Sequence, residues 1–147
     1  MCRAKEYLYI EASCIMNYSD IAIRFFESNG AKLAIREVGE GCPLVLVRGW
    51  PVTGYIWRFL IPALSQHFKC YILDLPGLGD SDWNDKTDFY WEVQADRIVD
   101  LISSEGISEV SLIANDRGGA IARLVAIELK QKVKHLILTN AEIPNLV

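Results

Sequence analysis

One short stretch, residues 110–120, constrains the fold of this chain more than any other. An apolar run rich in β-branched residues ends at Ala114, and apolar residues with helical spacing follow Gly118. Asp116 lies between them, flanked by small residues. Because a Cβ near the tip of a tight strand-to-helix turn would collide with the opposite arm, such neighbours predict a strained turn with an exposed side chain at its tip. The pattern predicts a nucleophile elbow that presents the Asp116 carboxylate; the alternative is an Asp that caps the following helix.

The composition indicates a globular protein that acts on neither nucleic acid nor membranes. The chain has 147 residues, a length typical of one domain, and 51% of them are hydrophobic and 23% charged. The net charge is -4 and the basic residues are scattered, so we expect no nucleic-acid-binding face and no polybasic membrane patch. The absence of a long apolar run and of a signal-peptide pattern favours a cytoplasmic location.

The cysteines and histidines do not indicate a metal site. The sequence holds four cysteines without a CxxC pair or other metal-ligand spacing, and only two histidines. Free thiols in a reducing compartment are the favoured interpretation. We therefore expect neither a metal nor a cofactor.

Strand and helix patterns alternate along the chain and predict an α/β fold. The Asn29-Gly30 turn joins two strands in an antiparallel hairpin, and the later apolar runs indicate a mostly parallel sheet. Residues 1–15 fit none of these elements and are interpreted as a peripheral N-terminal extension to a core of residues 16–147. The predicted strands are 23–26, 32–38, 43–47, 70–73, 110–114 and 135–139; the predicted helices are 55–67 with a break at Pro62, 89–104 with Phe89 facing inward and Asp88 as its cap, and 118–131.

Four local motifs, in their order along the chain, resemble the N-terminal half of an α/β-hydrolase-fold enzyme. The resemblance is greatest to the branch that includes haloalkane dehalogenases and epoxide hydrolases. It implies a partial hydrolase core over residues 16–147, truncated before the cap domain and the last strands. The motifs are the hairpin ending in Gly39-Glu40-Gly41, the loop Arg48-Gly49-Trp50-Pro51 where the family has HGxP, the segment DLPGLGDS at 74–81, and the elbow Asn115-Asp116-Arg117-Gly118-Gly119.

The resemblance implies a specific chemistry for Asp116. In that branch an Asp at the elbow attacks carbon, opens an epoxide or displaces halide, and forms an alkyl ester that a His-activated water hydrolyses. A carboxylate is already ionised at neutral pH, so it needs no base to become a nucleophile. The oxyanion hole would consist of the backbone N–H groups of Trp50 and Arg117. The side chains of Trp50, Pro51 and Arg117 would contact the small-molecule substrate.

Several departures from the family pattern affect this interpretation. The catalytic His of the family lies near the C-terminus, whereas His67 and His135 are predicted at a helix end and at the sheet end opposite the elbow. Glu142 follows the last strand at the same sheet end as the elbow and is a candidate acid; a solvated loop charge is the alternative. Trp50 and Arg117 occupy the positions that hold halide in haloalkane dehalogenases, so that halide site is not reproduced.

Three hypotheses of function remain from the sequence. The first is an incomplete Asp-nucleophile hydrolase that lacks the catalytic His, and the second is a non-catalytic α/β module that binds a ligand or is vestigial. The third, a serine esterase, is disfavoured by the Asp at the elbow. Truncation would leave residues 136–139 as an apolar edge strand, which predicts self-association.

Overall fold

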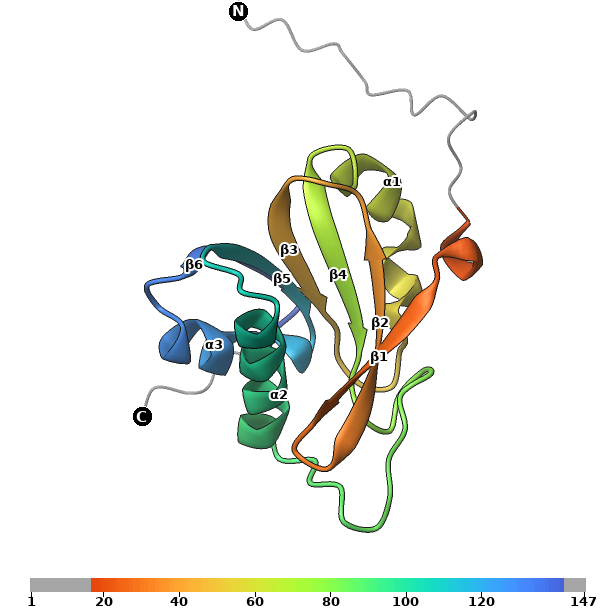
Figure 1. Ribbon diagram of the computed structural model, residues 1–147, viewed down its shortest axis with the longest axis vertical. Coiled ribbons are helices and arrows are strands. Elements are labelled where there is room, and N and C mark those ends of the chain that lie inside the picture. Colours follow the sequence, from red (N-terminus) through yellow and green to blue (C-terminus); the bar gives the residue numbers. More distant parts are fainter. Residues whose placement is uncertain (1–16, 142–147) are drawn as a thin grey trace, which may run out of the picture.

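The computed structural model describes residues 17–141, so the predicted extension at 1–15 and the candidate acid Glu142 lie outside the described residues (Figure 1). Six strands of this part form one sheet in the order β1-β2-β4-β3-β5-β6. Strands β1 and β2 form the antiparallel hairpin, β2 also runs antiparallel to β4, and the remaining pairs are parallel. The strands are β1 (Ile23–Ser28), β2 (Ala31–Val38), β3 (Cys42–Val47), β4 (Phe68–Asp74), β5 (Val110–Asn115) and β6 (Val133–Thr139).

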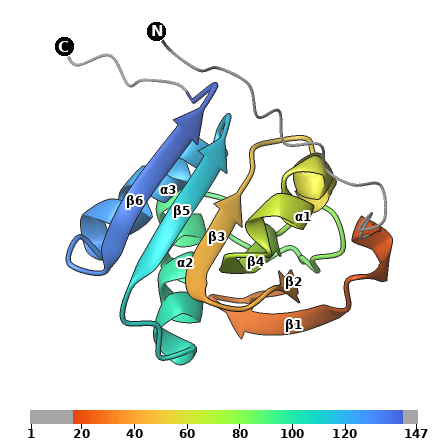
Figure 2. The same cartoon turned by 90° about the horizontal axis from the view of Figure 1, so that it is seen from above.

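Helices cover both faces of the sheet but cover them unequally. Helices α2 (Trp91–Ser104) and α3 (Gly118–Glu128) lie on one face, and the 3-10 helix η3 (Gly54–Phe59) with the short α1 (Ile61–Leu64) lies on the other (Figure 2). A further 3-10 turn, η2 (Tyr18–Asp20), precedes β1. The central strands are apolar over most of their length because both of their faces are buried. The α/β class predicted from the sequence is confirmed.

The helical segment predicted at 55–67 forms two pieces, as expected, but the break lies before Pro62. The 3-10 helix ends at Phe59, and α1 begins at Ile61 with Pro62 in its first turn. A proline in the first turn of a helix removes an N–H that has no helical partner anyway, so Pro62 fits the start of α1.

Helix α2 begins later than predicted, which corrects two expectations. Its first residue is Trp91, and Phe89 lies ahead of the helix with about half of its surface exposed. Asp88 does not cap the helix; its Oδ1 accepts a hydrogen bond from the backbone N–H of Tyr90 at 2.8 Å. Helix α3 ends at Glu128, three residues before the predicted end at 131.

A buried arginine ties the β1–β2 hairpin to helix α2. The Arg97 guanidinium donates to three backbone carbonyl oxygens, those of Ser28 at 3.3 Å, Asn29 at 2.8 Å and Asp88 at 2.9 Å. Burial lowers the pKa of Arg97, but the cation remains the form that can satisfy three acceptors. This contact was not predicted, because the helical pattern of residues 89–104 assigns only apolar residues to the buried face.

Candidate active site

The turn between β5 and α3 has the geometry predicted for an elbow. Asp116 has a φ of 53°, in the left-handed region that is costly for a residue with a Cβ. A Cβ placed on Gly118 would lie 2.7 Å from the backbone carbonyl carbon and oxygen of Arg48. The small residue after the tip is therefore required, because the turn packs directly against the backbone that leaves β3.

The Asp116 side chain is not used to cap the following helix. Its backbone N–H donates to the carbonyl of Thr139 at 3.1 Å, and its carbonyl accepts from Gly119 at 2.8 Å. The residue at the N-cap position of α3 is Arg117, without a side-chain capping bond. The half-buried carboxylate accepts no hydrogen bond from residues 17–141, so its lone pairs are available for chemistry.

The loop after β3 lies against this carboxylate. A Cβ placed on Gly49 would be 2.2 Å from Asp116 Oδ2 and 2.8 Å from the backbone nitrogen of Arg117, so only glycine fits there. The backbone N–H groups of Trp50 and Arg117 donate to no residue within 17–141. The structure thus brings together the carboxylate and the loops that carry two unpaired backbone donors.

A half-open cavity adjoins these loops, and its size is typical of sites that bind small molecules. Its volume is 470 Å³, and the loops after β3 and β4 and the first turns of α2 and α3 form its walls. Of the residues expected to contact substrate, Trp50 and Arg117 line it, whereas Pro51 does not. We call it the aromatic cavity, after four of its lining side chains, Trp50, Trp83, Phe89 and Trp91. Gln94 and Arg117 also line it.

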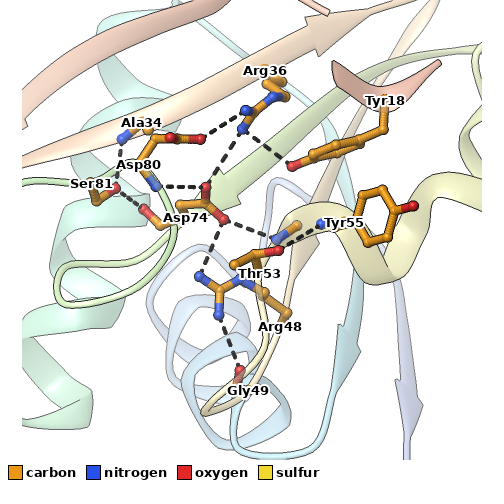
Figure 3. A network of polar contacts seen from close by, with 11 residues as sticks. Tyr18, Ala34, Arg36, Arg48, Gly49, Thr53, Tyr55, Asp74, Asp80 and Ser81 are labelled. Carbon is orange, nitrogen blue, oxygen red and sulfur yellow. Dashed lines mark hydrogen bonds and ion pairs between the residues drawn. The ribbon is translucent and has the colours of Figure 1, made fainter. Parts of the chain in front are cut away.

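A buried carboxylate at the end of β4 fixes the two loops that border the elbow (Figure 3). Asp74 is 2% exposed, and its Oδ1 accepts from Arg48 Nη2 at 3.2 Å and from the backbone N–H of Gly54 at 2.9 Å. Its Oδ2 accepts from the backbone N–H of Asp80 at 3.2 Å and lies 3.5 Å from Arg36 Nη1. One side chain therefore holds the loop after β3 and the loop after β4 together.

Arg48 extends this network to the candidate oxyanion loop. Burial lowers the pKa of the Arg48 guanidinium, and the adjacent Asp74 carboxylate opposes that shift. Its Nη1 donates to the carbonyl oxygen of Gly49 at 3.2 Å (Figure 3). In a trans peptide the next N–H points away from that carbonyl, so this bond directs the N–H of Trp50 to the side opposite Arg48. Arg48, which stands where the family has His, thus bonds to Asp74 on one side and to Gly49 on the other.

The outer part of the network balances the charges of the two arginines. Arg36 Nη2 pairs with Asp80 Oδ2 at 2.8 Å, and Arg36 Nη1 donates to the hydroxyl of Tyr18 at 3.3 Å. Burial, with a further contribution from Asp74, raises the pKa of Tyr18 to about 12, so its hydroxyl is neutral at ordinary pH. Two cations thus face two carboxylates, which is the condition under which buried charges are tolerated.

Both histidines of the chain lie at the end of the sheet opposite the elbow, which is the position predicted for His135. His135 is near the start of β6, where its Nδ1 lies 3.2 Å from Ser111 Oγ, and His67 immediately precedes β4. Asp116 follows the opposite end of the parallel strands, five positions beyond Ser111 and therefore roughly 16 Å from it. Within residues 17–141 there is no cluster of three or more potential metal ligands, and no helix there is long and apolar enough to cross a bilayer.

The strand order, the elbow after β5 and the glycine loop after β3 define an α/β protein whose candidate site lies at the carboxyl ends of its parallel strands. Residues 43–146 match the alpha/beta hydrolase fold family. The chain therefore belongs to the α/β-hydrolase fold family, in agreement with the resemblance found in its motifs.

The similar proteins include epoxide hydrolases and haloalkane dehalogenases. The soluble epoxide hydrolase of Corynebacterium sp. (strain C12) is 37% identical over 119 residues, which are 81% of this chain and 41% of that protein. The solved epoxide hydrolase CorEH matches with a TM-score of 0.79 and 35% identity, over 87% of this chain and 44% of that one. Haloalkane dehalogenase DbeA from Bradyrhizobium elkani USDA94 matches with a TM-score of 0.78 and 31% identity, over 85% and 43%. The chain thus spans less than half the length of these relatives.

Proposed function

We propose that Asp116 is the nucleophile of a hydrolase that opens epoxides or cleaves carbon–halogen bonds. The observation that carries the proposal is the Asp116 carboxylate, held at a positive φ against Gly49 and without a hydrogen-bond donor among residues 17–141. Its named relatives, an epoxide hydrolase and a haloalkane dehalogenase, support the choice of substrate class.

The proposed reaction has two steps. A carboxylate oxygen of Asp116 attacks carbon, and the electron pair of the broken bond leaves on halide or on the epoxide oxygen, which takes a proton from water. The product is an alkyl ester. Attack of water on the ester carbonyl, with loss of a proton to solvent, then gives a tetrahedral oxyanion, which the N–H groups of Trp50 and Arg117 would stabilise. Its collapse breaks the bond to the alkyl oxygen and releases the alcohol and the Asp116 carboxylate.

The second step is expected to be slow in this chain. Hydrolysis of such an ester needs a base that activates water, and both histidines of the sequence lie at the opposite end of the sheet. Glu142, proposed as an acid, lies outside the described residues. The ester on Asp116 should therefore accumulate.

Intact-mass measurement after incubation with styrene oxide tests this directly. We expect one hydroxylamine-sensitive adduct per chain, mapped to the peptide that contains Asp116, because hydroxylamine cleaves an ester. The matched variant Asp116→Asn should lose it, because an amide is a far weaker nucleophile and asparagine tolerates the positive φ. A folded wild-type chain that forms no such ester, or an equal ester yield from the variant, would contradict the proposal.

Cysteine adducts can be told apart in the same experiment. Cys42 is exposed and can form a thioether, which resists hydroxylamine. Cys70 is buried, and burial raises the pKa of its thiol to about 11, so it should remain unmodified in the folded chain. If Asp116 proves unreactive in folded protein, the alternative of a non-catalytic binding module takes precedence.

We also propose that the chain self-associates through β6. This strand forms an edge of the sheet within residues 17–141, and Ile137 on it is 52% exposed. An unpaired apolar edge is a template for pairing with a second copy. We expect the mass measured by light scattering to rise with concentration and Ile137→Lys to suppress that rise. Ile127→Lys, at a 70% exposed position on α3, is the matched control; an equal effect of both, or a monomer at all concentrations, would refute the proposal.

A further inference from the structure

The aromatic cavity leaves four large aromatic side chains exposed around one hollow. Trp50, Trp83, Phe89 and Trp91 line it, and their exposed fractions lie between 44% and 62%. Trp83 and Phe89 contact each other edge to face, with ring centroids 6.1 Å apart. Contiguous apolar surface of this kind is unfavourable in water, and an aromatic ring placed among these side chains would remove it from solvent.

A buried amide with an unpaired oxygen also lines the cavity. Gln94, in the first turns of α2, is 5% exposed, and its Oε1 has no hydrogen-bond partner. Its amide nitrogen also bonds to no residue within 17–141. Rotation about the last side-chain torsion exchanges the two atoms, so the amide can offer the cavity either an acceptor or a donor. A ligand group that both donates and accepts would complement it in either orientation.

The charges around the cavity favour a neutral ligand. Arg48 and Arg117 line it without any Asp or Glu, but Asp74 neutralises Arg48. The remaining cation, Arg117, is next to the Asp116 carboxylate, which lies against Gly49 of the cavity wall. A cationic ligand would therefore be repelled by Arg117, and an anionic ligand would be repelled by Asp116.

We propose that the aromatic cavity binds a neutral aromatic carboxamide. The ring packs among Trp83, Phe89 and Trp91, and the carboxamide forms a pair of hydrogen bonds with the Gln94 amide, one donated and one accepted. Binding in this cavity does not require the chemistry of Asp116. Because Trp50 and Arg117 belong to both sites, a larger substrate could place its carboxamide end here and its reacting carbon at Asp116.

The four tryptophans make this proposal testable by NMR with benzamide as the probe. Three indole N–H groups belong to residues that line the cavity, and the fourth, Trp57, is buried against the opposite face of the sheet. We expect the signals of Trp50, Trp83 and Trp91 to shift saturably in ¹H–¹⁵N spectra, with Kd on the order of millimolar for so small a ligand, and the Trp57 signal to stay in place. Single Trp→Phe variants assign the four signals.

Two analogues and one pair of variants identify the contacts. Methyl benzoate lacks the amide donors and cyclohexanecarboxamide lacks the aromatic ring, so each should bind at least about fivefold more weakly. Gln94→Leu should weaken benzamide binding by about tenfold and methyl benzoate binding by less, because the ester can only accept a hydrogen bond from the Gln94 amide. Gln66→Leu, at an exposed position beyond α1, is the matched control.

The stability of Gln94→Leu separates a ligand-binding role from a structural one. Because the Gln94 oxygen has no partner, its loss should leave the unfolding midpoint unchanged or raised. Loss of a glutamine with a structural role would lower that midpoint. The proposal is overturned if benzamide shifts all four indole signals alike or none up to its solubility limit. It is also overturned if Gln94→Leu binds benzamide as tightly as the wild type.

Discussion

Replacing Asp74 by asparagine is expected to lower the free energy of unfolding by about 3–5 kcal/mol, the range for removal of one partner from a buried ion pair. The carboxylate accepts from Arg48 and from two backbone N–H groups and faces Arg36. The variant would leave two buried or nearly buried guanidinium groups without their shared counter-charge. Urea unfolding followed by circular dichroism measures the loss.

Asp80→Asn is the control for this experiment. Asp80 pairs with the same Arg36, but half of its side chain is exposed, so its loss should cost only about 0–1 kcal/mol. A double variant, Asp74→Asn with Arg48→Met, should recover part of the stability because it removes one unpaired buried charge. Equal losses for Asp74→Asn and Asp80→Asn would show that Asp74 does not hold the network together.

Replacing Gly49 by alanine is expected to slow alkylation of Asp116 by at least about 100-fold, the loss typical of a misplacement near 1 Å. The added methyl group would lie 2.2 Å from Asp116 Oδ2 and 2.8 Å from the backbone nitrogen of Arg117. Either the carboxylate rotates or the elbow withdraws from the loop after β3. The rate of ester formation, followed by intact mass, measures the effect.

Gly106→Ala is the matched control for the glycine substitution. Gly106 has a φ of +65° and no atom within 4 Å of an added Cβ, so alanine there costs about 1 kcal/mol of stability. It should leave the alkylation rate unchanged. If Gly49→Ala reacts as fast as Gly106→Ala, the loop after β3 does not position the nucleophile.

The sheet and the elbow were predictable because their signals are local in the sequence. Apolar runs mark the buried strands, and the small residues around Asp116 mark a turn that must pack tightly against another backbone segment. The approach of the loop after β3 to the elbow, seen at Gly49, also agrees with the order of the motifs. The start of α2 was misplaced because Asp88 resembles a cap, although the chain remains extended up to Tyr90.

The polar contacts inside the fold were not predictable from pattern alone. Asp74 opens a recognisable motif, but its role depends on arginines that are 26 and 38 residues away in sequence. Gln94 and Arg97 lie on the buried side of α2, where periodicity predicts apolar residues. Their partners, or the lack of them, are determined by the tertiary packing of the hairpin and of the loop after β4.

That loop, residues 75–90, is fastened at several points along its length. Near its start the Ser81 hydroxyl donates to the carbonyl of Asp74, and the N–H of Asp82 donates to the carbonyl of Lys32 at 2.9 Å. Near its end Arg97 holds the carbonyl of Asp88. Because these contacts would have to break before the segment could move, we expect no lid motion of residues 75–90 on the microsecond-to-millisecond scale. Ligands should then enter and leave the aromatic cavity by ring rotation alone, fast enough for free and bound signals to average into one moving peak.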